Sequence, residues 1–119
     1  MVARYRAAMS ASIASTMQLA LRDAMKARDR VAMAALRTAL AAIANAEAVP
    51  IDAAPTDVYG ELVEHERQVL AESELVQIVQ HQIDDRRATA AQVAAHGRTD
   101  EAAVLTAEAD VLAGILGPN

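Results

Sequence analysis

Cysteine, phenylalanine and tryptophan are all absent from this chain of 119 residues, and tyrosine occurs only twice. Without cysteine there can be no disulfide, no thiol nucleophile and no cysteine-ligated zinc. Without large aromatic rings, any core must be aliphatic, built from Leu, Ile, Val, Met and Ala. Glycine and proline are scarce as well, with four and three residues. Abundant alanine with few helix breakers predicts an all-α protein.

Long apolar runs and the β-branched alternation of strands are also missing from the sequence. No stretch approaches the roughly 18 apolar residues that suggest a membrane span. Serine and charged residues interrupt the alanine-rich stretch that follows Arg4 and Arg6, so we do not interpret it as a signal peptide. We therefore expect a cytoplasmic protein with no membrane partner.

Motifs for catalysis and cofactor binding are lacking too. The four glycines are isolated, which excludes a glycine-rich phosphate loop, and no Ser-His-Asp order is evident. His81 with Asp84 or Asp85 supplies half a metal site at best. We expect no catalytic residue, no metal, no cofactor and no small-molecule substrate.

Charge is distributed unevenly along the chain. Residues 1–47 carry seven basic and three acidic side chains, whereas residues 48–119 carry four basic and thirteen acidic ones. The two parts thus have net charges of +4 and −9. Such asymmetry can mark a basic face for nucleic acid, or oppositely charged helices that attract one another. The overall charge of −5 favours the second interpretation.

The central segment of the chain is an apolar helix rich in alanine. Met33, Leu36, Leu40 and Ile43 follow one another at steps of three, four and three. This spacing places four bulky side chains on one helical stripe, and the alanines between them allow close approach of other helices. We expect the centre of a small helical bundle here.

Capping residues and breakers divide the rest of the chain. Residues 1–9 are expected to be a frayed lead-in, with Met9 as an alternative start, and residues 10–117 to form one helical domain. A first helix from near Ser10 or Ser12 to Arg28, which Ser12 could cap, and a second from about residue 30 to Ala48, capped by Asp29, should form an antiparallel hairpin because their joint is short. A third helix is expected over about 72–96 and ends at Gly97, and Thr99 should cap the last helix.

The region around residues 49–71 is the least regular part of the predicted domain. Pro50 and Pro55 indicate a loop, and Thr56 or Asp57 could begin another helical segment. That segment either continues into the third helix, as one helix over about 57–96, or stops at a break near residues 71–73. We slightly favour the break.

Arg86 and Arg87 form the most informative polar group. Val76, Val79, Ile83, Arg86, Ala90 and Val93 follow steps of three and four, so the apolar stripe passes through position 86. A buried arginine needs a partner, which Glu47, Glu108 or Asp110 could provide. Either such an ion pair fixes the helix register, or Arg37, Arg86, Arg87 and Arg98 contact an anion such as RNA.

Several segments together resemble the YqeY family. The segments are Ala24-Met25-Lys26-Ala27-Arg28-Asp29, Leu36-Arg37 through Ile43, Asn45-Ala46-Glu47, Arg86-Arg87, Ala95-His96-Gly97-Arg98 and Ala107-Glu108-Ala109-Asp110-Val111-Leu112. Their order and spacing cover residues 10–117, with divergence at 49–71. That family is similar to the helical tail of GatB, a subunit of the glutamine-dependent tRNA amidotransferase.

The resemblance implies a non-catalytic helical module associated with tRNA, accessory to glutamine-dependent amidotransferase systems. The family's label of carbon–nitrogen ligase would then be an analogy at the level of fold. The family also continues into a second helical domain that this chain lacks, which would leave surface open to a partner. The alternative is a protein-interaction or oligomerisation module without an RNA role. The residues that would make RNA contacts or buried ion pairs are Arg37, Asn45, Glu47, Arg86, Arg87, Arg98 and Glu108.

Overall fold

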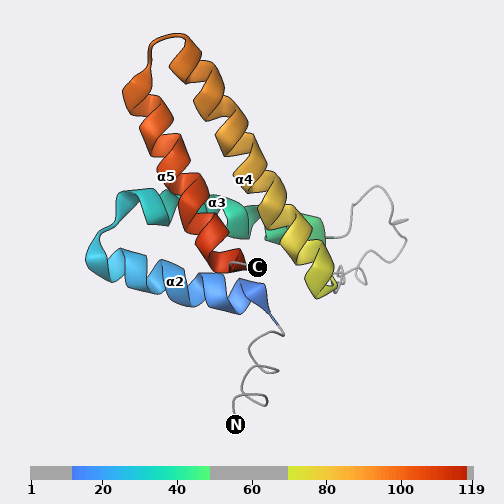
Figure 1. The fold of residues 1–119 in the computed structure, drawn as a ribbon. Helices are drawn as coiled ribbons and strands as arrows, with labels where there is room; N and C mark the ends of the chain where they lie inside the picture. Colours follow the sequence, from blue (N-terminus) through green and yellow to red (C-terminus); the bar gives the residue numbers. More distant parts are fainter. Residues whose placement is uncertain (1–11, 49–69, 118–119) are drawn as a thin grey trace, which may run out of the picture.

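The computed structural model describes residues 12–48 and 70–117, and within them every regular element is an α-helix. The four helices are α2 (Ile13–Ala27), α3 (Arg30–Glu47), α4 (Glu72–Ala95) and α5 (Thr99–Leu116). Figure 1 shows α2 with α3 and α4 with α5 as two antiparallel hairpins. The predicted all-α fold, with a hairpin followed by a long helix and a C-terminal helix, is confirmed. The lead-in over residues 1–9 lies outside the described residues.

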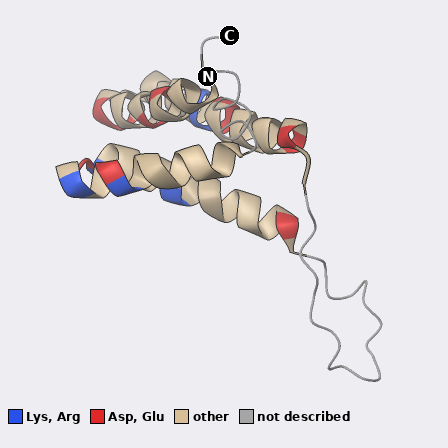
Figure 2. Cartoon of the chain, turned by 90° about the horizontal axis from the view of Figure 1, so that it is seen from below, with Lys and Arg blue, Asp and Glu red and all other residues tan. Residues whose placement is uncertain are grey.

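The two hairpins form two layers that cross each other. Seen from below, the α2–α3 pair and the α4–α5 pair lie one over the other (Figure 2). The contact between α4 and α5 is the most extensive, and α3 packs against all three other helices. The far end of the α4–α5 hairpin extends beyond the α2–α3 layer (Figure 1). Every helix contacts the other three, and α3 contributes the most buried side chains, in agreement with its predicted place at the centre of the bundle.

Side-chain caps fix the ends of the first hairpin. Ser12 Oγ accepts the Ser15 N–H at 3.0 Å, and Asp29 Oδ1 accepts the Ala32 N–H at 3.0 Å. Between the helices, Arg28 has a left-handed backbone with φ of 58°, and its N–H donates to the Met25 carbonyl. Both predicted caps are confirmed, and Arg28 turns the chain where glycine is more usual.

The core is aliphatic and contains many alanines. In α3, the buried stripe passes through Ala32, Ala35, Leu36, Ala39 and Ile43. Ala35 and Ala39 are fully enclosed, which brings neighbouring backbones close to the α3 axis. Met33 and Leu40 from the predicted stripe are only half-buried and pack against the edge of this core. The remaining buried side chains are Met17, Ala24, Leu75, Val79, Ile83, Ala90, Ala109 and Leu112.

The break before α4 lies where the sequence placed it. Ala71 is the extended N-cap residue, and its N–H donates to Glu74 Oε1 at 2.8 Å. Since neither Leu70 nor Ala71 is helical, a single helix over 57–96 is excluded. The helical segment predicted from Thr56 or Asp57 lies outside the described residues. At the other end, Gly97 has a φ of 82°, which confirms its predicted left-handed conformation.

Two local predictions about the second hairpin were wrong. Val76 was predicted to lie on the buried stripe of α4, but it is exposed. The buried stripe begins instead at Leu75, which lies about 100° away from Val76 around the helix. Thr99 is the first helical residue and not the cap. Arg98 is the cap residue, because its carbonyl accepts the first helical hydrogen bond, from the Ala102 N–H at 3.1 Å. Its side chain makes no capping bond.

None of these four helices, the only ones in the described parts of the chain, has both the length and the apolar character needed to cross a membrane.

Candidate functional site

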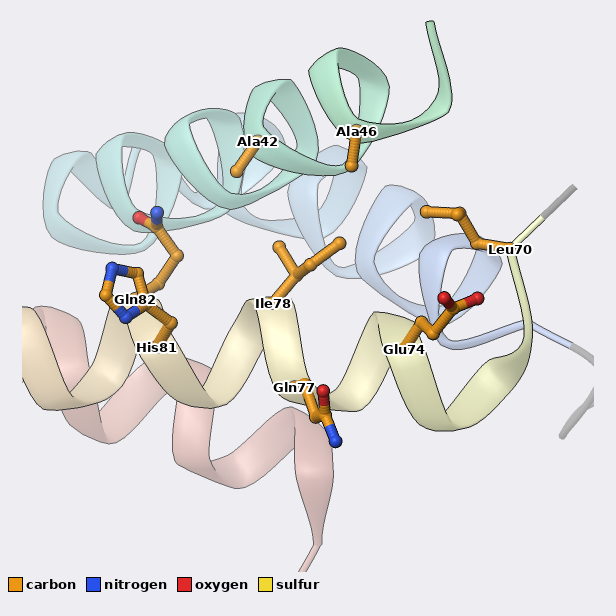
Figure 3. A pocket seen from close by; sticks show the side chains of 8 residues that line it. All are labelled: Ala42, Ala46, Leu70, Glu74, Gln77, Ile78, His81 and Gln82. Atoms are coloured by element: carbon orange, nitrogen blue, oxygen red, sulfur yellow. The ribbon is translucent and has the colours of Figure 1, made fainter. Parts of the chain in front are cut away.

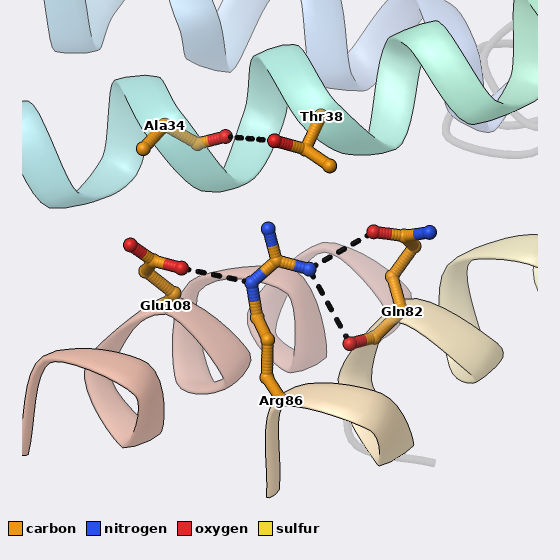
Figure 4. Close-up of polar contacts among 5 residues, drawn as sticks. All are labelled: Ala34, Thr38, Gln82, Arg86 and Glu108. Atoms are coloured by element: carbon orange, nitrogen blue, oxygen red, sulfur yellow. Dashed lines mark hydrogen bonds and ion pairs between the residues drawn. The ribbon is translucent and has the colours of Figure 1, made fainter. Parts of the chain in front are cut away.

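A polar network joins the two helices of the second hairpin (Figure 4). Arg86 Nε donates to Glu108 Oε1 at 2.9 Å, and Arg86 Nη1 donates to Gln82 Oε1 at 2.9 Å. The Arg86 and Glu108 side chains are only 12% and 14% exposed. Figure 4 shows the guanidinium between α4 and α5, directed toward α3. There Thr38 donates its hydroxyl to the Ala34 carbonyl at 2.8 Å.

This network occupies the position that the sequence singled out. Position 86 lies on the apolar stripe, and Glu108 is one of the three carboxylates that the sequence offered as partners. A charge-assisted bond in such an enclosed place holds its two helices in one register. Arg86 is therefore engaged inside the fold and presents little surface to an external anion.

The other two arginines of the second hairpin are exposed and paired with acids. Arg87 Nη2 lies 3.4 Å from Asp110 Oδ1, and Arg98 Nη1 lies 3.5 Å from Glu101 Oε1. Both pairs are more than half exposed, so each contributes little to stability. Arg98 stands at the turn between the helices, away from the Arg86 network.

The α3 members of the predicted set lie in the other layer. Arg37 and Asn45 are exposed, and Glu47 is half-buried. Arg37 and Glu47 line a groove of about 630 Å³ between α2 and α3, to which Gln18 and Ser15 also contribute. The fold thus divides the predicted residues between two layers and does not assemble them into one site.

A second group of cations includes Arg37, but its other four members were not singled out from the sequence. These side chains are exposed, lie on α2, α3 or their joint, and take part in none of the ion pairs within residues 12–48 and 70–117. We call them the hairpin cations: Arg22, Lys26, Arg28, Arg30 and Arg37. Figure 2 shows this concentration of basic residues on the α2–α3 layer. The charge asymmetry of the sequence was the signal that could have identified them.

Helical spacing aligns four of these cations into two rows. Arg22 and Lys26 are one turn apart on α2, and Arg30 and Arg37 are two turns apart on α3. The exposed α3 row carries alanines at positions 34, 41 and 44, and Arg37 is exposed beside them. The nearby Asp29 carboxylate is bound to the α3 N-terminus. The arrangement offers guanidinium and ammonium donors to an extended anion.

A separate pocket of about 510 Å³ lies between α3 and α4 (Figure 3). Ile78 points toward Ala42 and Ala46, with Leu70 at one end. Glu74, Gln77, His81 and Gln82 complete the lining. The pocket is therefore apolar inside and polar to acidic at its rim.

In the described parts of the chain, no group of three or more His, Asp or Glu side chains is placed to hold a metal ion. His81 Nε2 lies 4.0 Å from Asp85 Oδ2, and both side chains are exposed.

No family model, no curated protein and no solved structure matched this chain. The resemblance to the YqeY family therefore stays a prediction from the sequence.

Proposed function

We propose that this chain is a non-catalytic helical module of the GatB/YqeY type, a tRNA-associated accessory to glutamine-dependent amidotransferase systems. The observation that carries the proposal is the set of five exposed hairpin cations that enter no ion pair within the described residues. The arginine-rich hairpin is also the part of the chain where the resemblance begins.

The proposal assigns the RNA contact to the α2–α3 hairpin and not to Arg86. Phosphate contact by Arg86 would leave Glu108 without its partner in an enclosed position, at a substantial cost in free energy. Arg30 and Arg37 have no such competing bond and lie on one face of α3. Two turns of helix separate them by about 10.5 Å, a distance that phosphates along one strand can span.

A tRNA titration at two salt concentrations tests this function. Wild-type binding should weaken steeply as salt rises, because phosphate contacts release counterions. The R30A/R37A variant should lose affinity and reduce the slope of log K against log salt by roughly 1.4 to 1.8, about 0.7 to 0.9 per lost contact. The matched control is R87A/R98A, which removes the same charge from the other layer and should bind nearly as the wild type does.

Two results would reject the proposal: no binding of tRNA at low salt, or equal losses for the two variants. Equal losses would mean that only net charge matters. The alternative, an interaction or oligomerisation module without an RNA role, is favoured by the internal pairing of Arg86 with Glu108. It predicts no tRNA binding by any of these proteins.

A further inference from the structure

Helix α2 presents an apolar and basic stripe to solvent. Leu19 and Met25 are 54% and 50% exposed, the highest values among the large apolar residues that the structure describes as exposed. Leu19, Arg22 and Lys26 follow at steps of three and four, on the side of α2 opposite the buried Met17. The stripe thus combines one exposed apolar side chain with two cations, neither of which forms an ion pair with an acid in the described parts of the chain.

The pocket between α3 and α4 has the complementary character. Its interior is formed by Ile78, Ala42 and Ala46, and none of the described residues that line it is a lysine or an arginine. Glu74 and Asp85 lie four residues before and seven residues after Ile78, on the same side of α4. Glu74 accepts the Ala71 N–H through one carboxylate oxygen, and Asp85 is exposed beside His81. An apolar side chain flanked by cations fits such a pocket.

The spacings along the two helices agree. Seven residues separate Leu19 from Lys26, and seven separate Ile78 from Asp85, so each pair spans about 10.5 Å along its helix. If α2 of one molecule lies parallel to α4 of another, Leu19 reaches Ile78 while Lys26 reaches Asp85. Glu74 adds to the negative field over the pocket.

We infer that a second copy of this chain docks the α2 stripe (Leu19, Arg22 and Lys26) into the α3–α4 pocket. The contact is head-to-tail, because each molecule uses one surface as donor and a different one as acceptor. Association continues from molecule to molecule until a ring closes or an open chain grows. The inference does not depend on RNA binding.

Sedimentation of the full chain over a concentration series, in about 50 mM and about 500 mM NaCl, tests the association and its electrostatic part. We expect oligomers at low salt and an apparent Kd that rises about tenfold or more at high salt. A monomer at both salts would overturn the inference, as would association that is unaffected by salt.

A mixing experiment tests the head-to-tail geometry. L19S/K26S removes the donor stripe, and E74K/D85K reverses two acidic charges on α4, one at the acceptor pocket and one beyond it. Each variant alone should stay monomeric, whereas their mixture should form a 1:1 dimer because one intact stripe meets one intact pocket. Absence of this dimer, or a dimer in either variant alone, would contradict the proposed contact.

A matched control separates the docking surface from a general loss of exposed apolar and basic groups. R98S/V104S makes the same two types of substitution on the second hairpin, where Val104 is 46% exposed. This control should associate like the wild type, with helicity checked by circular dichroism for every variant. L19S/K26S retains Arg30 and Arg37, so its tRNA affinity should fall far less than that of R30A/R37A. The two proposals can therefore fail separately.

Discussion

Among single residues, Arg86 is the one whose burial and need for an acidic partner the sequence predicted best. Its place between Ile83 and Ala90 on the apolar stripe of α4 indicated that it turns inward. The choice of Glu108 over Asp110 could not be predicted, because it depends on how α4 and α5 are aligned, and both acids lie on α5. Arg87, the next residue along α4, pairs with Asp110 instead and remains exposed.

Arg86→Ala should lower the free energy of unfolding by about 1 to 3 kcal/mol, because it leaves Glu108 enclosed without its partner. The control Arg87→Ala should change it by less than about 0.5 kcal/mol, as its pair is exposed. Replacing both partners, as in R86M/E108L, should restore most of the loss. Urea denaturation of the three variants measures these differences, and equal effects of the two single substitutions would refute the structural role of Arg86.

At the scale of helices, local chemistry made the boundaries predictable. Ser12 and Asp29 are good caps, and Gly97 is a natural end for α4, so three limits agree with expectation. The start of α5 and the buried face of α4 were misplaced. Thr99 has the right chemistry for a cap, but the backbone bond from Ala102 to Arg98 begins the helix one residue earlier. Which of two neighbouring residues becomes the N-cap here depends on the backbone conformation of the turn, and not on how well each side chain suits a cap.

Two glycines should respond to alanine in opposite directions. Gly97→Ala should destabilise the fold by about 1 to 2 kcal/mol, because φ at this position is positive and an alanine side chain disfavours that conformation. Gly114→Ala should stabilise it by about 0.5 to 1 kcal/mol, since Gly114 lies inside α5 with open space around its Cα. Thermal unfolding of both variants provides the measurement. A stabilising Gly97→Ala would contradict the left-handed turn.

For the whole molecule, the sequence predicted the helices but not how the hairpins cross. Apolar stripes reveal which side of a helix is buried, yet the crossing angle depends on how ridges of side chains interlock. The crossing decides that the hairpin cations and Arg86 lie in different layers. The candidate site predicted as one set was therefore divided, although each of its members in α3, α4 and α5 lies on the helix expected for it.

The crossing also leaves the far part of the α4–α5 hairpin without support from the other layer. No residue between Ala91 and Glu108 is buried, whereas Ala35, Leu36 and Ala39 in α3 are almost fully enclosed. Amide hydrogens near the hairpin turn should therefore exchange through local opening, at least about tenfold faster than those of central α3, which require global unfolding. Hydrogen exchange followed by NMR measures this ratio, and equal protection would indicate that the hairpin opens only with the whole fold.

The turn at Gly97 thus lies at the end of a projecting arm, away from the surfaces proposed for RNA binding and self-association (Figure 1). For protein engineering, the turn at the end of this arm is a suitable site for attaching a label or a second domain. A fluorophore, an affinity tag or a fused domain joined there would be held away from the hairpin cations, from the α2 stripe and from the α3–α4 pocket. The chain could be tethered at this turn while all three of these surfaces stay open to the solution.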